Sequence, residues 1–222
     1  MNLREIIEAT LIELDRGTEA DTVAMYAKKF TMYANEAVEE IARRFKVCTL
    51  NFTELSSFNS DSVGFDISTG DFDHAPKRIT RIMQDTATVD PGTGNVSHDV
   101  HFDKRPYDFK QFVHGAPYIH VWGNDAKAGD VIAVEYLYVP VPMTVESLDN
   151  QAPNEPDSPD LPTYLHSLIP LYVRAREQCG QDPSLQGTSS AYFSLFNQKV
   201  YQLQRETLAT PDSFMFKNYH FE

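Results

Sequence analysis

The chain lacks three things that would point to common functional classes: a long apolar run, a cysteine pattern and an excess of basic charge. No apolar stretch approaches the roughly 18 residues of a membrane-spanning helix, so we expect no membrane span. The two cysteines, Cys48 and Cys179, belong to no CxxC or Cys/His cluster and are expected to be ordinary buried thiols. The amphipathic, acidic start of the chain is unlike a secretory signal, so a reducing cytoplasm is the expected compartment.

Charge is the next limit on function. The 222 residues include 32 Asp and Glu against 19 Lys and Arg, a net charge of −13. Proteins that grip nucleic-acid phosphates carry a basic footprint, and this chain has none at the level of a whole domain. An anionic membrane surface is disfavoured for the same reason. By itself, the acidic balance indicates only solubility.

Helical spacing of apolar residues marks both ends of the chain, and a hydrophobic fraction of 41% is enough for a real core. Helices are predicted over residues 2–15 and 21–45, the second with Asp21 as its N-cap. A third helix is expected to open at Asp160-Leu161-Pro162 and to end near Gly180, with a kink at Pro170 because proline removes a helical hydrogen bond. A last helix is expected up to Leu208.

The middle of the chain changes to the two-residue period of β-strands. Alternation runs through 48–52, 63–67 and 96–102, and residues 118–122 and 131–139 complete the set, with glycine, proline, Asn and Asp between the segments. A basic, β-patterned stretch lies at 78–83, and Asp90-Pro91-Gly92-Thr93-Gly94-Asn95 is typical of a hairpin turn. Six or seven short strands of this kind predict a small antiparallel sandwich or barrel inserted between helices.

Candidate catalytic residues are few. In His98-Asp99-Val100-His101-Phe102-Asp103 the two histidines point to opposite faces of a strand, so one metal ion cannot bind both, although His101 and Asp103 share a face. Nucleophile elbows, phosphate-binding glycine loops and His-Glu-x-x-His helices are absent. Gly187-Thr188-Ser189-Ser190 is typical of a helix start. We therefore expect no enzyme, no cofactor and no metal site.

Two further groups have both a functional and a structural interpretation. Asp61, Asp66, Asp71 and Asp73 could bind calcium, but their spacing does not fit an EF-hand loop, and solvated loop positions explain them better. Tyr118, Trp122, Tyr136 and Tyr138 could form a sugar-binding face, and packing in a small β-core explains them better.

The end of the chain is rich in aromatic residues. After Pro211 come four aromatic side chains within eight residues, Phe214, Phe216, Tyr219 and Phe221. Such a segment is expected to be covered, either by its own domain or by a partner subunit. These four residues are our candidates for a protein interface.

Several of these segments, taken in order, resemble one known family. They are Arg78-Ile79-Thr80-Arg81-Ile82, a glycine hairpin, Pro117-Tyr118-Ile119, Gly129 to Tyr136 ending at Pro140-Val141-Pro142, and then Asp160 to His166. This order resembles the β-insertion and third helix of the head–tail adaptor proteins of short-tailed bacteriophages, and Ala191 to Leu203 resembles their fourth helix. The resemblance covers residues 1–208, as an order of elements with weak motifs at the joints.

The resemblance implies an α+β protein: a four-helix bundle body with an inserted small antiparallel β-sandwich or barrel and an extended C-terminal tail. The expected parts are the first half of the body at 1–47, the β-insertion at 48–145, a proline-rich acidic linker at 146–162, the second half of the body at 163–208 and a docking tail at 209–222.

The resemblance also implies a place and partners. The chain would form a ring, commonly of twelve copies, between the portal protein and the next tail or nozzle protein, in the virion neck after assembly in the host cytoplasm. Genome DNA would pass through the ring without specific binding, since an acidic lumen repels phosphates. The aromatic tail would anchor to a neighbour or to the portal.

Three alternatives stay open at this point. One is another ring component of the virion, such as a tail terminator or tail-tube protein. Another is a host-surface or carbohydrate-binding β-module on a helical stalk, which predicts an exposed aromatic groove around Trp122. The third is a metal-dependent hydrolase that uses His101 and Asp103.

Overall fold

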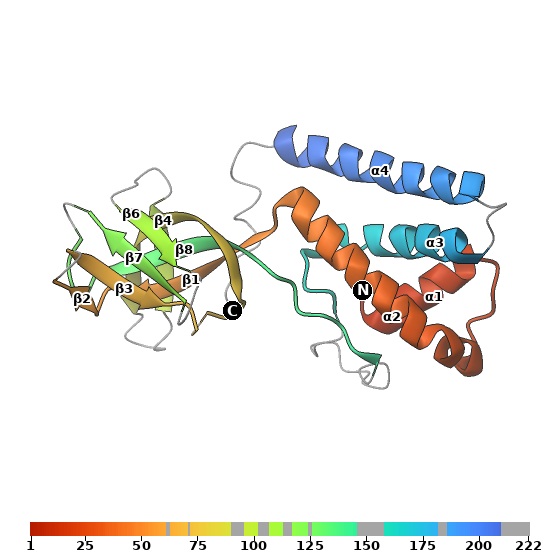
Figure 1. Cartoon of the computed structure of the whole chain (residues 1–222), viewed down its shortest axis with the longest axis horizontal. Helices are drawn as coiled ribbons and strands as arrows, with labels where there is room; N and C mark the ends of the chain where they lie inside the picture. The colour runs from red at the N-terminus through yellow and green to blue at the C-terminus, as the bar shows by residue number, and fades with distance from the viewer. Residues whose placement is uncertain are drawn as a thin grey trace. The chain divides into compact units, whose positions relative to one another are not determined.

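The computed structural model describes residues 1–60, 63–70, 72–89, 96–101, 107–112, 117–123, 126–145, 158–181 and 186–209. The chain divides into two compact units (Figure 1). The helical unit comprises Met1–Phe45 and Pro140–Glu222, and the β unit is Lys46–Val139. The chain therefore leaves the helical unit once and returns to it once.

The helical unit contains α1 (Leu3–Glu13), α2 (Ala20–Phe45), the 3₁₀ turn η2 (Thr163–Leu165), α3 (Leu168–Gln181) and α4 (Gln186–Ala209). Its core is built from the apolar stripes of α1 and α2 and from α3. Fully buried side chains include Ile6, Phe30, Ile41 and Ile169. These stripes follow the helical spacing of the sequence, which is why the two N-terminal helices form where they were predicted.

Local sequence fixes the start of α1. The Asn2 side chain accepts a hydrogen bond from the Glu5 backbone N–H at 2.8 Å, and Glu5 Oε2 accepts one from the Asn2 N–H at 3.0 Å. This reciprocal capping box satisfies two backbone donors that a helix start leaves unpaired. Gly17 then lies in the connection to α2.

The expected four-helix bundle body is wrong. Helices α1, α2 and α3 contact one another, whereas α4 packs mainly on α3, and Figure 1 shows it outside α3. Among the described side chains of α4, only Phe196 and Val200 are buried. A bundle helix needs a wide apolar stripe facing a shared core, and α4 offers too narrow a stripe for that. The molecule is a mixed α+β fold in which α4 is an outer layer.

The expected kink at Pro170 is also wrong. Pro162 precedes the turn η2, and α3 begins only at Leu168, so Pro170 is the third residue of that helix. In the first turn a backbone N–H has no helical partner, so proline costs nothing there. The prolines therefore place the start of α3 rather than bending it.

In its described residues the β unit holds eight strands in two antiparallel sheets. The first has the order β1-β8-β4-β5 and the second the order β2-β3-β7-β6. The strands are β1 (Cys48–Glu54), β2 (Phe58–Asn59), β3 (Gly64–Ser68), β4 (Pro76–Val89), β5 (Val96–His101), β6 (Asp108–Phe112), β7 (Tyr118–Trp122) and β8 (Val131–Tyr138). Strand β4 pairs with β8 over its first half and with β5 over its second, and irregular register near Pro76 and Ile79 bends it.

One apolar core lies between the two sheets. Ile79, Ile82, Ile132, Val134 and Tyr136 come from the first sheet, and Phe65, Ile67, Ile119 and Val121 come from the second. Gly64 of β3 lies tightly against β7 within the second sheet, because a Cβ there would be 2.6 Å from the Val121 carbonyl oxygen. The sheets curl round this core as a half-barrel, open along the sides where edge strands have no strand partner among the described residues.

Candidate functional site

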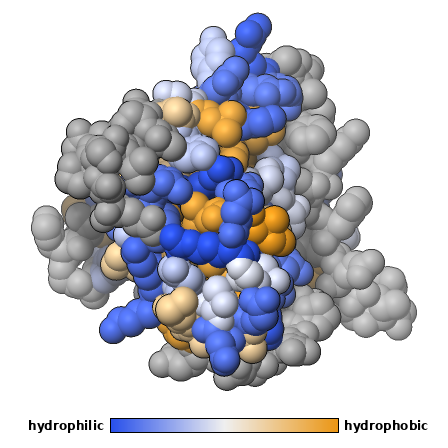
Figure 2. All heavy atoms as spheres, turned by 90° about the vertical axis from the view of Figure 1, so that its right-hand side faces the viewer, coloured by the Kyte–Doolittle hydropathy of each residue, from blue (hydrophilic) through white to orange (hydrophobic). Residues whose placement is uncertain are grey.

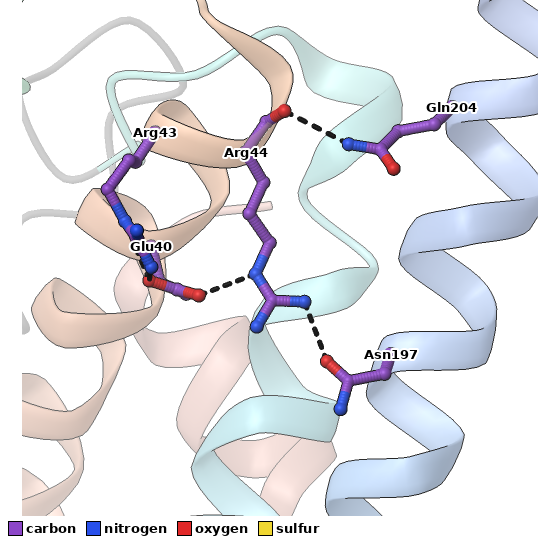
Figure 3. A network of polar contacts seen from close by, with 5 residues as sticks. All are labelled: Glu40, Arg43, Arg44, Asn197 and Gln204. Atoms are coloured by element: carbon purple, nitrogen blue, oxygen red, sulfur yellow. Dashed lines mark hydrogen bonds and ion pairs between the residues drawn. The ribbon is translucent and has the colours of Figure 1, made fainter.

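A polar network joins the end of α2 to α4 (Figure 3). Arg44 donates to Glu40 Oε1 and, through Nη1, to Asn197 Oδ1 at 2.6 Å. Gln204 Nε2 donates to the backbone carbonyl of Arg44 at 3.0 Å. That carbonyl lies in the last turn of α2, where helical partners run out, so Gln204 acts as a cap supplied by another helix.

The same region contains a groove of about 500 Å³. Its walls are the network residues together with Arg43, Val200 and Tyr201, and the Tyr201 side chain is 62% exposed. Burial would raise the pKa of Glu40, but hydrogen bonds from Arg43 and Arg44 outweigh it and hold that pKa below its ordinary value. The groove therefore presents paired charges and a tyrosine ring, which suits contact with another protein surface better than binding of an anion.

A buried carboxylate lies deeper in the helical unit. Glu177 of α3 is 0% exposed, and its two oxygens contact Lys29 Nζ at 2.6 Å and Arg16 Nη1 at 3.3 Å. The two cations are partly exposed and come from α2 and from the connection between α1 and α2. Because the carboxylate is neutralised by cations from α2 and from the α1–α2 connection, the arrangement fixes the packing of α3 on these segments rather than preparing an acid or a base.

In the β unit a second groove, of about 330 Å³, lies between β1 and β3. Ile67 and Phe72 line it beside the polar groups of Asn51, Thr53, Ser56, Ser57 and Ser68 and the carboxylates Glu54 and Asp66. Asp66 accepts hydrogen bonds from Asn59 at 2.8 Å and from His120 at 2.7 Å, and the hydrogen bond from Asn59 is the largest cause lowering the pKa of that carboxyl. Asp66 is thus charged at neutral pH.

The histidine cluster singled out in the sequence does not form one site. His98 bonds the buried Asp85 at 2.5 Å, and its ring stacks on Phe52 with the ring centres 3.8 Å apart. His101 instead contacts the hydroxyl of Thr86 at 3.1 Å. Asp103 lies outside the described residues. Within those residues no group of three or more His, Cys, Asp or Glu side chains is placed to hold a metal ion.

The four aromatic residues considered for sugar binding belong to different places. Tyr136 is fully buried in the core, and Tyr138 packs beside His74. Trp122 stacks near His120, and Tyr118 stacks on Phe112, both in the second sheet. The four rings therefore share no single face, because β7 and β8 lie in different sheets.

The remaining sequence candidates divide in the same way. Cys48 is partly buried, and burial together with Glu135 raises the pKa of its thiol to about 12. Cys179 is exposed, so the expectation that both thiols are buried is wrong for this residue. Several candidates lie outside the described part of the chain: Asp61, Asp71, the turn at 90–95, residues 146–157 and all four candidate interface residues. The α2–α4 network was missed in the sequence, and its one available signal was a pair of arginines at a helix end.

Surface character agrees with a protein that contacts other proteins at limited areas. Figure 2 shows one face of the helical unit, where hydrophobic areas are broken up by hydrophilic side chains. The exposed large apolar side chains of this unit include Ile12, Met25 and Met32. No helix among the described residues is both long and apolar enough for a membrane span.

Comparison with known proteins adds one finding. A family model described as SU10 adaptor protein matches residues 1–213, which is nearly the whole chain. No curated protein matches the chain.

Proposed function

Because the chain belongs to the SU10 adaptor protein family, a phage head–tail adaptor family, we propose that it forms a ring that joins the portal to the tail. Proteins of this family are structural proteins of the bacteriophage virion. The match over residues 1–213 carries the proposal, since it spans both the helical unit and the β unit. The proposal includes a position in the neck of a short-tailed phage.

The function of such a ring is geometric. It matches the symmetry of the portal on one side and offers a docking surface to the next tail or nozzle protein on the other. The genome passes through the channel of the ring. A net charge of −13 per copy disfavours binding of the DNA to the protein, because negative charges repel phosphates. A ring of twelve copies is the stoichiometry we propose.

No chemical step is part of this function. The titratable clusters of the described residues, around Glu177, Asp85 and Asp66, are carboxylates closed by cations or histidines within the fold. Asp66 lines the groove between β1 and β3, but its oxygens accept hydrogen bonds from Asn59 and His120. The proposal therefore assigns a structural role to the chain and no reaction.

The aromatic residues Phe214, Phe216, Tyr219 and Phe221 are proposed to anchor each copy to a neighbour or to the portal. Aromatic side chains provide large contact areas at low entropic cost and dominate many interfaces. They follow directly after α4, whose outer surface is exposed. The anchor would therefore extend from the least enclosed helix of the chain.

The main test locates the chain in purified virions. We expect it between the portal and the next tail component, as a closed ring round the channel, when particles are imaged by electron cryomicroscopy. A position at the distal end of the tail would instead make it a tail terminator. If the chain is absent from virions and also fails to bind its cognate portal in solution, the adaptor proposal is refuted.

A second experiment tests the anchor. A variant with Phe214, Phe216, Tyr219 and Phe221 all replaced by Ser should bind the portal or assemble into rings at least about tenfold more weakly. Phe58→Ser, which removes an exposed aromatic ring from β2, is the matched control and should leave assembly intact. Equal assembly of the fourfold variant and the wild type would remove the anchor from the proposal.

A further inference from the structure

The groove between α2 and α4 has a cationic wall and an aromatic wall, and we call it the α2–α4 groove. The Arg43 side chain of α2 is 68% exposed, and Tyr201 of α4 is 62% exposed. Arg44, Asn197 and Gln204 also line the groove, and the hydrogen bonds in Figure 3 hold them together. The groove therefore combines a fixed polar lining with two side chains that can be contacted from outside.

Stacking of arginine on aromatic rings recurs in the described part of the helical unit. Guanidinium groups lie over rings, 4.1–5.9 Å from the ring centre, in these pairs: Arg16 on Tyr26, Arg44 on Phe196, Arg174 on Tyr192, Arg176 on Tyr33 and Arg205 on Tyr201. Arg43 differs, because among the described residues it contacts only the Glu40 carboxylate and no ring lies over it. An exposed guanidinium attracts the face of an aromatic ring, so the groove is complementary to aromatic side chains.

The chain itself supplies aromatic side chains directly after α4. Helix α4 ends at Ala209, and the 13 residues at 210–222, which we call the aromatic tail, contain the four candidate interface residues. A segment of this length spans up to about 43 Å when extended, because each residue adds about 3.3 Å. The part of α4 from Asn197 to its end is only about 18 Å long, at 1.5 Å per residue. The aromatic tail is therefore long enough to pass beyond its own helix to a neighbouring copy.

The charges of the two surfaces are opposite. The acidic and basic residues of the aromatic tail, Asp212, Lys217 and Glu222, give it a net charge of −1. The groove has two guanidinium groups and one carboxylate, Glu40, whose pKa is held below its ordinary value, so its net charge is +1. Opposite charges favour a tail in a groove over two tails or two grooves in contact.

We propose that the α2–α4 groove of one copy receives the aromatic tail of a neighbouring copy. Rings of the tail would stack on the Arg43 guanidinium and pack against Tyr201, as arginine and tyrosine already do within the helical unit. Every copy carries one tail and one groove, so the contact is of the head-to-tail kind, which leads to a ring when the rotation between copies closes. The inference rests on the proposed ring and anchor, and it names the surface to which the anchor binds.

Binding of a peptide tests whether the groove recognises the tail. The tail variant is the full chain with the four aromatic residues of the tail replaced by Ser. A fluorescent peptide of residues 210–222 should bind it at least about tenfold more tightly than it binds the same chain with Arg43→Ala and Tyr201→Ala added, measured by fluorescence anisotropy. Met25→Ala with Lys28→Ala is the matched control. It removes one exposed apolar side chain and one exposed cation from α2 outside the groove, and should leave peptide binding unchanged.

A mixture of two full-length variants tests whether the tail and the groove belong to different copies. The groove variant, Arg43→Ala with Tyr201→Ala, keeps its tail, and the tail variant keeps its groove. Each alone should self-associate at least about tenfold more weakly than the wild type in analytical ultracentrifugation. Mixed in equal amounts, the two should form dimers with one intact contact. Species larger than dimers should not form, because the second tail and the second groove of each pair are both altered.

Two results would overturn the proposal. They are equal peptide binding with and without the groove substitutions, or a mixture that forms no dimers. Peptide binding without mixed dimers would assign the tail to the groove of its own copy. The adaptor function is tested separately. If the tail variant fails to bind the portal and the groove variant still binds and assembles, only the groove contact is refuted, whereas mixed dimers of a chain that is absent from virions refute only the adaptor function.

Discussion

The helical unit and the β unit are held together by different means. In the helical unit, charged side chains link helices that are distant in sequence: Glu177 with Lys29 and Arg16, Glu36 with Arg176, and Glu13 with Arg174. In the β unit, strand pairing and one shared apolar core do most of the joining. Loss of one of these charges should therefore lower the stability of the helical unit more than that of the β unit. Loss of buried apolar volume should lower the stability of either unit by a similar amount.

The largest effect should come from deleting core volume. Phe30→Ala in α2 and Ile132→Ala in β8 each remove a fully buried side chain and should lower the free energy of unfolding by about 3–5 and about 2–5 kcal/mol. Hydrogen exchange followed by mass spectrometry should show the loss of protection mainly in the unit that carries the substitution. Equal loss in both units from either variant would mean that they unfold as one.

The next largest effect should come from the buried carboxylate. Glu177→Gln leaves Lys29 and Arg16 without their counter-charge, and we expect a loss of about 2 kcal/mol because both cations can still reach water. Glu13→Gln, which breaks a more exposed pair with Arg174, should cost at most about 1 kcal/mol. Urea unfolding of the two variants measures the difference, and similar costs would show that burial of Glu177 is unimportant.

A smaller effect is expected at the link between α2 and α4. Arg44→Ala removes the contacts to Glu40 and Asn197 and the packing of the guanidinium over Phe196, whose ring centre is 5.3 Å away. It should cost about 1–2 kcal/mol and increase hydrogen exchange in α4. Arg43→Ala, which breaks only an exposed contact to the same Glu40, should leave stability nearly unchanged, because water screens exposed ion pairs. Matching exchange in both variants would contradict a role for the network in holding α4.

The smallest effect is the dependence of folding stability on pH. Burial lowers the pKa of His166, whose Nε2–H donates to the Leu161 carbonyl at 2.8 Å. The folded state thus takes up a proton at lower pH than the unfolded chain does. Its contribution to stability is full above the unfolded pKa of about 6.5 and declines as pH falls from there toward the lowered value. His166→Gln should flatten the dependence of stability on pH in that range, and an unchanged slope would contradict this.

Periodic segments were predictable from the sequence because one physical signal dominates them. The stripe from Val23 to Phe45 forms α2, and the short apolar segments at 118–122 and 131–139 form β7 and β8. The resemblance to phage head–tail adaptors is confirmed at the level of a phage adaptor family. These predictions succeeded where many residues point to the same period.

Predictions failed where a single residue is compatible with two local structures, or where a contact joins residues distant in the sequence. Pro170 is compatible with a kink inside a helix or with the first turn of one, and the structure has it in the first turn of α3, which begins at Leu168. Lys46, directly after α2, lies in the left-handed region at φ 51°, where glycine would be expected, but the change of period still predicted the end of α2 at 45 and a strand from 48 correctly. The links of Arg44 and Glu177 depend on residues more than 140 positions apart, which no local pattern reveals.

The pairing of Cys48 with Leu137 has a consequence for the history of the chain. Paired residues of neighbouring strands lie about 4.5–5.5 Å apart, so the β unit begins and ends at almost the same point. A segment with adjoining ends can be exchanged, enlarged or removed while the host segment keeps its own core. A chain in which a short glycine-rich connection joins Phe45 to Pro140 should therefore keep α1 to α3 folded. Evolution could have exchanged β modules on one helical unit by the same route.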